Sequence, residues 1–164
     1  MRTMRQVPGE TSQRTDIEHL YREQGHKMWC SVLGFAGDPE IANDAISEAF
    51  AQVLRRGDAV RDPERWVWRA AFRIAAGALK DRSRRAAEPS EQFYEMAEPA
   101  VDLMRALAEL PQTQRAAVVL HHSGGYPMKE VAAILGSTTA AVKVHCLRAR
   151  RRLRRLLDDQ PGEG

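Results

Sequence analysis

The chain has 164 residues, 43% of them hydrophobic, with 25 Lys or Arg against 22 Asp or Glu and a net charge of +3. This length is enough for one domain or two small ones with modest packed cores. The sequence has no apolar run long enough to span a membrane and no signal-peptide core at its N-terminus, so we expect a cytoplasmic protein without membrane insertion.

The charges are segregated along the chain. Residues 55–85 hold ten bases against four acids, residues 86–110 hold six acids and one base, and residues 138–157 hold seven bases and no acid. A single basic run is often only a solvated helix face. Two such runs on predicted helices instead favour pairing with phosphate backbones, which releases counterions.

The N-terminal half predicts a three-helix domain over residues 15–85. Residues 1–14 are polar and aperiodic, so we expect disorder there, and an amphipathic helix should run from Thr15 to Gly37. Two further helices share one start signal, an Asp N-cap followed by Pro at the first helical position. These helices are expected at Pro39–Arg56 and from Pro63 to Arg82 or beyond.

The third predicted helix has an unusual surface. Arginine recurs every four residues and forms a stripe on one face, at Arg65, Arg69 and Arg73. Trp68 and Phe72 share another face, where they are expected to join a core. Trp66 lies near the arginine stripe, and the sequence leaves it open between core and surface. Exposed aromatic and basic side chains together suit stacking and phosphate pairing on an unpaired strand.

An acidic, proline-containing segment at 86–99 predicts a linker to a second domain at 100–157. One helix there should end before Pro111, and another should run from Gln112 to His122. The last seven residues, 158–164, are expected to be disordered. The sequence therefore predicts an all-α fold, with a three-helix domain and a four-helix domain joined by an acidic linker.

The last two helices of this second domain predict a helix-turn-helix between Met128 and Leu157. Gly136 separates two periodic runs and suits a left-handed helix end, and Thr138 suits the N-cap of the second helix. This second helix is basic. A short helix, a glycine turn and a basic helix are typical of proteins that place a helix in the DNA major groove.

Motifs for other chemistry are missing from the sequence. Cys30 and Cys146 lie far apart and are expected to be small buried hydrophobes. His121 and His122 end a helix, but no further ligand lies at metal spacing. No phosphate-binding glycine loop occurs. Asp44 and Glu48 lie four residues apart in the second predicted helix, and we interpret them as part of a binding face rather than as an acid/base pair. We therefore expect no enzyme activity, no metal and no cofactor.

Four stretches resemble the extracytoplasmic-function (ECF) group of bacterial RNA polymerase sigma factors. LPQTQRAAVVL resembles the family's LPxxQRxVLxL, and the stretch from Gly125 to Leu157 resembles its GxSYxEIAxxLGxSxGTVKSRLxRARxxLRxxL. In the first half, GDPEIANDAISEAF resembles GDxxDAEDxxQExF, and RDPERWVWRAAFRIA resembles FRxWLxRIARNLA. The resemblance covers about residues 16–157.

The resemblance implies partners and site residues. The N-terminal domain would dock on the clamp coiled coil of the polymerase's largest subunit through Asp44, Ala45, Glu48 and Phe50. It would recognise and melt the −10 element through Asp58, Val60, Arg61, Arg65, Trp66, Arg69 and Arg73. The C-terminal domain would meet the flap of the second-largest subunit and read the −35 element through Thr138, Thr139, Lys143, Val144, His145, Arg148 and Arg151. The family also makes an anti-sigma factor a common partner.

The sequence departs from the family pattern at a few positions. Ser137 replaces an apolar residue after the turn, Val144 and His145 stand where Ser and Arg are usual, and Arg73 and Gly77 replace Asn and Asp. These departures concern promoter sequence more than the fold.

Three other functions compete with a sigma factor: a dimeric operator-binding regulator, a sigma-like decoy that only binds a partner, and a nucleic-acid enzyme. The first has no need of the helix that carries Asp44 and Phe50, and the last lacks a metal or acid/base cluster. The two-domain order favours the sigma factor. A core-binding assay without DNA would separate the decoy from the operator-binding regulator.

Overall fold

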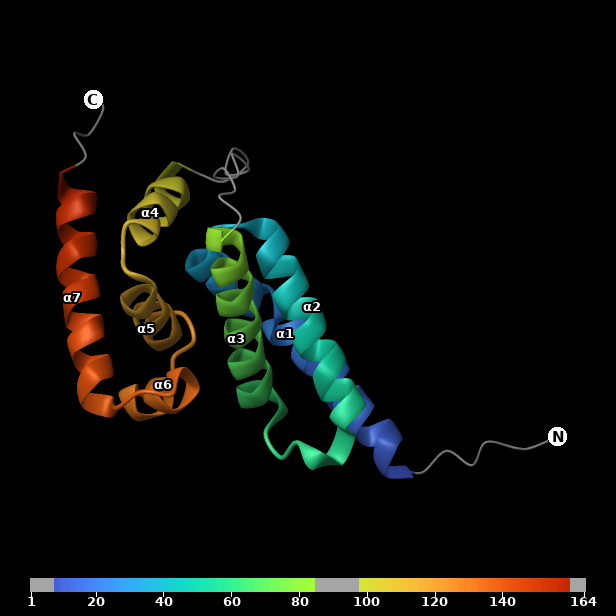
Figure 1. Ribbon diagram of the computed structural model, residues 1–164. Coiled ribbons are helices and arrows are strands. Elements are labelled where there is room, and N and C mark those ends of the chain that lie inside the picture. Colours follow the sequence, from blue (N-terminus) through green and yellow to red (C-terminus); the bar gives the residue numbers. More distant parts are fainter. Residues whose placement is uncertain (1–7, 85–97, 160–164) are drawn as a thin grey trace.

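The computed structural model describes residues 8–84 and 98–159. Over these residues the chain is helical with no strand, which confirms the all-α prediction (Figure 1). The helices, in chain order, are α1 (Pro8–Ala36), α2 (Pro39–Arg56), α3 (Pro63–Arg84), α4 (Glu98–Ala108), α5 (Gln112–His122), α6 (Met128–Leu135) and α7 (Thr139–Asp158). We call α1–α3 the N-terminal bundle and α4–α7 the C-terminal bundle.

The shared start signal of α2 and α3 operates as predicted. The Asp38 carboxylate accepts a hydrogen bond from the Glu40 backbone N–H at 2.8 Å, and that of Asp62 accepts from the Arg65 N–H at 3.1 Å. Each carboxylate satisfies one of the donors left free at a helix start. Asp38 also pairs with Arg82 at 3.0 Å, which ties the start of α2 to the end of α3.

The first helix begins earlier than the sequence predicts. It starts at Pro8 rather than at Thr15, so the expectation of disorder is wrong for residues 8–14, while residues 1–7 lie outside the described part. Proline is tolerated in a first helical turn. These early turns pass the short 3₁₀ turn Gly57–Ala59, and a groove there is lined by both segments. Tertiary contact thus extends a helix that local composition disfavours.

Large apolar side chains fill the N-terminal bundle. Trp68 is 1% exposed, and the ring centres of Phe35 in α1 and Phe72 in α3 lie 5.1 Å apart. The prediction that Trp68 and Phe72 belong to a core is therefore confirmed. The arginine stripe lies on another face of the same helix, so the core fixes the direction in which α3 presents its charges.

The C-terminal bundle contains the predicted helix-turn-helix. Gly136 ends α6 with a φ of 63°, and the Thr138 hydroxyl accepts a hydrogen bond from the Ala141 N–H at 3.1 Å to begin α7. Both predictions are confirmed. Helix α4 begins at Glu98 instead of about Ala100, so the end of the predicted linker is helical, and the rest of the linker lies outside the described residues.

Replacing Thr138 with alanine should destabilise the start of the second helix of this motif. The Ala141 N–H loses its side-chain acceptor, and loss of such a cap costs about 1 kcal/mol. We expect that decrease in the free energy of unfolding, measured by urea titration. Thr138→Ser keeps the hydroxyl and should lose much less. Equal losses in the two variants would contradict a capping role.

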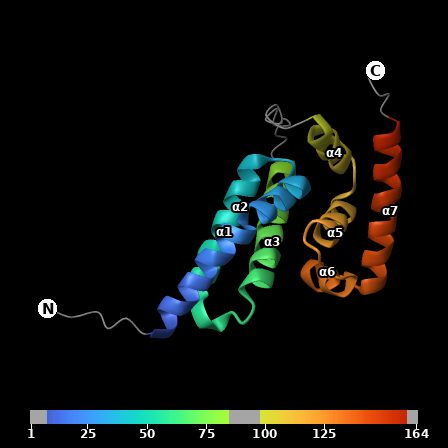
Figure 2. The ribbon, with the colours of Figure 1, turned by 180° about the vertical axis from the view of Figure 1, so that it is seen from behind.

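The two bundles pack against each other, and their buried residues form one hydrophobic cluster. Helix α1 contacts α5 and α4, and the two views of the ribbon both place α3 beside the C-terminal bundle (Figures 1 and 2). Helix α7 lies on the far side of that bundle from α2. The helices predicted to meet the −10 and −35 regions thus belong to two bundles that share one hydrophobic core.

Candidate nucleic-acid and polymerase interfaces

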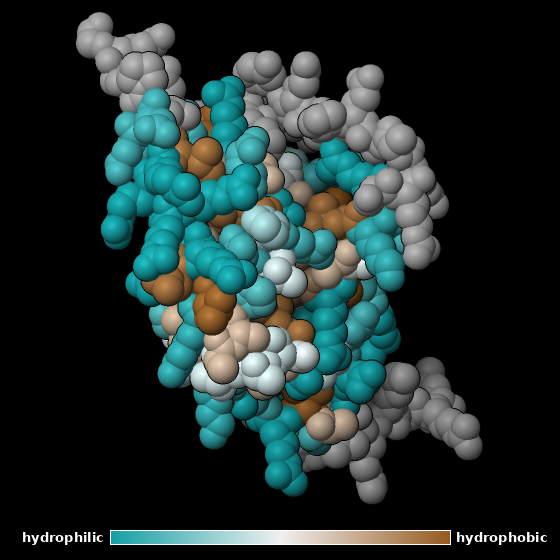
Figure 3. All heavy atoms as spheres, turned by 60° about the vertical axis from the view of Figure 1, so that its left-hand side comes forward, coloured by the Kyte–Doolittle hydropathy of each residue, from teal (hydrophilic) through white to brown (hydrophobic). Residues whose placement is uncertain are grey.

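Helix α7 presents a basic outer face. Its inner face is fixed by Val142, Cys146 and Ala149, none of which is exposed. Their spacing of four and three residues turns four of the predicted −35 residues outward, namely Lys143, Val144, Arg148 and Arg151. The molecule seen from the α7 side is mostly hydrophilic (Figure 3). Such a helix can offer cations to phosphates and an apolar side chain to a thymine methyl.

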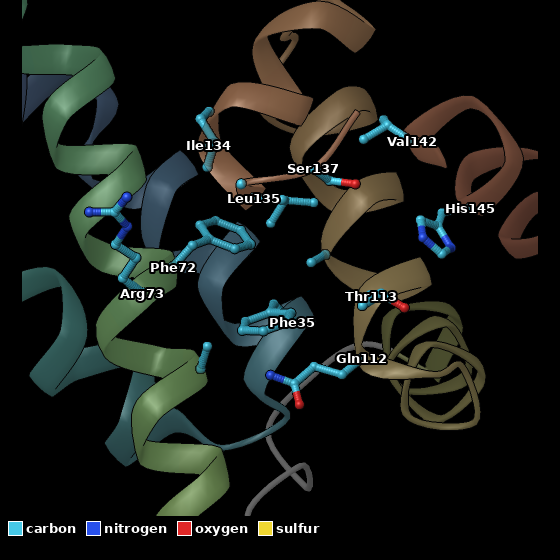
Figure 4. A pocket seen from close by; sticks show the side chains of 13 residues that line it. Phe35, Phe72, Arg73, Gln112, Thr113, Ile134, Leu135, Ser137, Val142 and His145 are labelled. Carbon is cyan, nitrogen blue, oxygen red and sulfur yellow. The ribbon is translucent and has the colours of Figure 1, made fainter. Parts of the chain in front are cut away.

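Three other predicted −35 residues have different surroundings. Thr138 is exposed but its hydroxyl caps α7, and Thr139 is half-buried. His145 is half-buried, and its Nδ1 is enclosed without a hydrogen-bond partner among the described residues. The His145 ring lines a groove of about 470 Å³ between the bundles, which Arg73 of α3 also lines (Figure 4). The structure therefore brings a predicted −35 residue and a predicted −10 residue to the same groove.

The exposed side of α3 carries the predicted arginine stripe. Arg65, Arg69 and Arg73 are all exposed. Trp66 is half-buried, and the Arg56 guanidinium lies 5.3 Å from the centre of its ring. The sequence left open whether Trp66 belongs to the core or to the surface. Its half-burial and this cation–π pair place it at the edge between the two. Arg56 was not predicted as a site residue, and only its place at the end of α2 could have suggested it.

The loop between α2 and α3 carries both exposed and buried members of the predicted −10 set. Asp58 and Arg61 are exposed, but Val60 is only 8% exposed. The prediction that Val60 meets DNA directly is therefore not supported, since its apolar side chain joins the core and anchors the loop. A groove of about 540 Å³ opens beside the loop, and three arginines line it: Arg14, Arg55 and Arg56.

Only two of the four predicted polymerase contacts reach the surface of α2. Asp44 and Glu48 are exposed, whereas Ala45 is 0% and Phe50 is 6% exposed. The motif places all four residues on one helix, but the helical period turns Ala45 and Phe50 toward α1 and α3. Direct contact by Ala45 and Phe50 is therefore not supported, and their packing instead fixes the orientation of α2.

The Glu48 carboxylate is held in place by its neighbours. It accepts hydrogen bonds from Gln52 Nε2 and from Arg55 Nη2, each at 2.9 Å. These bonds, that from Gln52 first, lower the pKa of Glu48 below its ordinary value. The carboxylate is thus ionised at neutral pH, and its negative charge is partly neutralised by the ion pair with Arg55.

The cysteines differ in environment. Cys146 is buried, as predicted, and burial raises the pKa of its thiol. Cys30 is exposed, so the prediction of burial is wrong there, and its Sγ lies 3.5 Å from His26 Nε2. Periodicity alone did not reveal that α1 turns this position to solvent. Within the described ranges no group of three metal-binding side chains occurs, and no helix is long and apolar enough to cross a membrane.

Comparisons with known proteins agree with this geometry. The family model for sigma-70, region 4 matches residues 100–153. The chain is 39% identical over 155 residues to the ECF RNA polymerase sigma factor SigM of Mycobacterium tuberculosis, covering 88% of this chain and 78% of SigM. It is 26% identical to the ECF sigma factor SigE of Mycolicibacterium smegmatis, covering 94% of this chain and 66% of SigE.

Solved structures share the fold. CnrH in complex with the cytosolic domain of CnrY superposes with a TM-score of 0.71 at 20% identity, covering 93% of this chain and 94% of CnrH. The sigma factor RpoE in complex with the anti-sigma factor NepR from Bartonella quintana superposes with a TM-score of 0.74 at 19% identity, covering 90% of this chain and 99% of RpoE. The chain therefore belongs to the ECF group of RNA polymerase sigma factors, transcription initiation factors that direct the polymerase to promoters.

Proposed function

We propose that this sigma factor binds core RNA polymerase through the exposed acidic face of α2 and grips a promoter at two points. The arginine face of α3 and the loop before it recognise and melt the −10 element. The outer face of α7 reads the −35 element in duplex form. The C-terminal bundle also meets the flap of the second-largest polymerase subunit.

The observation that carries this proposal is that one chain presents two different basic surfaces, on α3 and on α7. On α3, the exposed arginines lie beside Trp66 and Arg56, which suits an unpaired strand, whose bases can stack and whose phosphates need cations. On α7, cations and Val144 project from one long helix, which suits the major groove of a duplex. An operator-binding regulator has use for only the second face.

The test is run-off transcription with core polymerase and this protein as the sole specificity subunit, on fragmented genomic DNA from its source. We expect transcripts with discrete start sites that share two upstream elements. Core polymerase alone is the control for nonspecific initiation. Specific DNA binding without polymerase, combined with no specific transcript, would instead support the operator-binding regulator.

We also propose an anti-sigma factor as a partner. Support comes from the RpoE neighbour, whose structure contains the anti-sigma factor NepR. Such a partner, once added in stoichiometric amount to the run-off reaction, is expected to remove the specific transcript. A transcript that persists with the partner bound would contradict this part of the proposal.

Val144 is the α7 residue that we expect to change sequence preference. Its side chain is 44% exposed and apolar where the family usually has serine. A valine can contact a thymine methyl, whereas a serine hydroxyl donates or accepts a hydrogen bond. Val144→Ser should therefore change the difference in binding free energy between bases at one −35 position by about 1 kcal/mol. Competition among promoter duplexes that differ by a single base pair measures this difference. Unchanged preference at every −35 position would contradict this role.

A further inference from the structure

Three residues that depart from the family pattern line one groove. Ser137 replaces an apolar residue, Arg73 replaces Asn, and His145 stands where Arg is usual. All three line the groove of about 470 Å³, although they come from α3, the turn after α6, and α7. The fold thus gathers side chains that are distant in the sequence and that set this chain apart from the general pattern. The groove therefore has a chemistry of its own in this chain.

The groove has the dimensions and the apolar walls of a small-molecule site. Such sites typically enclose about 300–1,000 Å³ and combine apolar walls with a few polar groups. The phenyl rings of Phe35 and Phe72 lie side by side, with ring centres 5.1 Å apart, and Leu135 lies near them (Figure 4). Ile134 and Val142 extend the apolar lining. The hydrocarbon part of a ligand can pack against this wall.

Polar side chains line the groove from the C-terminal bundle. Thr113 of α5 and Ser137 of the turn contribute hydroxyls, and His145 of α7 contributes its ring (Figure 4). Thr113 and Ser137 are exposed, so their hydroxyls are accessible from the groove. Hydroxyls donate hydrogen bonds as well as accept them. The groove is thus divided into an aromatic part on α1 and α3 and a hydrogen-bonding part on α5 and α7.

The charge of the groove favours an anion. Arg73 is a permanent cation, and no Asp or Glu occurs among the described residues that line the groove. Helix α5 begins at the groove with Gln112 and Thr113, and Pro111 before it supplies no side-chain cap. The first turn of a helix has free N–H groups and carries the positive end of the helix dipole.

The His145 ring has an unmet hydrogen bond. Its Nδ1 is enclosed without a partner in the described part of the chain. A buried polar atom that is left unpaired costs free energy. Turning the ring by about 180° about its Cβ–Cγ bond exchanges Nδ1 with the carbon Cδ2. A ligand oxygen in the groove can therefore provide the hydrogen bond that the protein does not.

We propose that this groove binds a small amphipathic carboxylate. The hydrocarbon body of the ligand packs against Phe35 and Phe72, and its carboxylate accepts hydrogen bonds from Thr113, Ser137 and His145. A DNA phosphate could meet the polar part of the groove but would leave the aromatic wall uncovered. Promoter recognition does not require this ligand, so the site goes beyond the proposed function.

A heteronuclear NMR titration of the free, full-length chain with octanoate tests the site. We expect saturable shifts of the backbone amides of Thr113, Ser137 and His145, whereas the amide of Arg152, exposed further along α7, should not shift. Octan-1-ol has the same chain without the charge. It should bind roughly tenfold more weakly, because it loses hydrogen bonds to a charged group.

Replacing His145 with phenylalanine separates hydrogen bonding from packing. The variant keeps an aromatic ring of similar shape and removes both nitrogens. We expect the affinity for octanoate to fall by roughly tenfold and the affinity for octan-1-ol to stay unchanged. An equal loss for both probes would contradict the carboxylate contact, because it would mean that only packing had changed.

Filling the apolar part of the groove is the second variant. Ala76 of α3 is half-buried and lines the groove, and leucine is well tolerated in a helix. Ala76→Leu should weaken the binding of both probes by roughly tenfold or more, because its side chain occupies their place. Ala78→Leu is the matched control, since Ala78 is also half-buried on α3 but is not a lining residue. It should bind octanoate as the wild type does. Far-UV circular dichroism confirms that each variant is folded.

The site would be overturned by the absence of saturable shifts with octanoate. Shifts that survive Ala76→Leu unchanged would also overturn it, because the probe would then bind elsewhere. Octan-1-ol that binds as tightly as octanoate would refute the anionic class of ligand. Neither DNA nor polymerase is present in the titration, so a failed run-off assay would overturn the proposed function without changing these results.

Discussion

Replacing Trp68 with alanine is expected to lower the free energy of unfolding by about 3–5 kcal/mol. The indole is 1% exposed and lies between Phe72 of its own helix, with ring centres 6.1 Å apart, and Tyr126 of the other bundle. Its removal leaves a cavity that the surrounding helices can close only in part. The measurement is a guanidinium titration followed by circular dichroism, which reports on both bundles.

Trp66→Ala is the matched control for this prediction. Trp66 lies two residues away and has the same chemistry, but it is half-buried and its identified partner is the Arg56 guanidinium. We expect a loss of only about 1 kcal/mol in stability, together with weaker binding of single-stranded DNA, because a stacking platform is removed. Equal stability losses in the two variants would contradict the division of roles along α3.

Reversing the charge of Asp44 is expected to weaken binding to core polymerase by roughly 10- to 100-fold, a range typical when one partner of an interfacial charge pair is lost. Asp44 is exposed on α2 and, unlike Glu48, has no identified cation beside it in the described chain. Its charge is therefore available to a partner. Fluorescence anisotropy of labelled protein titrated with core polymerase measures the affinity of Asp44→Arg.

Asp81→Arg serves as the control, since Asp81 is an exposed acid near the end of α3 and the substitution changes the net charge by the same amount. It should bind core polymerase as the wild type does. If Asp44→Arg also retained wild-type affinity, docking through the acidic face of α2 would be wrong.

The helix starts and turns could be read from the sequence because they depend on local chemistry. Asp38 and Asp62 cap the helices that follow them, and Gly136 adopts the left-handed conformation that ends α6. Each of these signals involves residues only a few positions apart. The same holds for Thr138, whose hydroxyl bonds a backbone N–H three residues on.

Exposure could not be read in the same way. Motif matching placed Ala45, Phe50 and Val60 in functional stretches, but the packing of α1, α2 and α3 buries all three. Cys30 shows the reverse error, because its neighbours are apolar while its own position on α1 faces solvent. Burial is decided by which helix lies opposite, and that partner is distant in the sequence.

The contacts between the bundles had no local signal at all. Tyr126 and Glu130 lie in an ordinary turn and helix start, and their partners are about 60 residues earlier, on α3. Only the three-dimensional arrangement shows that Glu130 of α6 pairs with Arg65 of α3. The sequence could therefore predict each bundle separately but not the contacts between them.

The location of the indole rings gives the protein a built-in optical readout. Its three tryptophans, Trp29, Trp66 and Trp68, all lie in the N-terminal bundle, and the C-terminal bundle has none. Intrinsic emission therefore reports on α1–α3, whereas circular dichroism sums over all helices. A difference between the two denaturation curves would show directly whether the bundles unfold together. Tyr126 lies close enough to Trp68 to transfer excitation energy to it. Tryptophan emission excited through tyrosine therefore also reports on the contact between the two bundles, without any added dye.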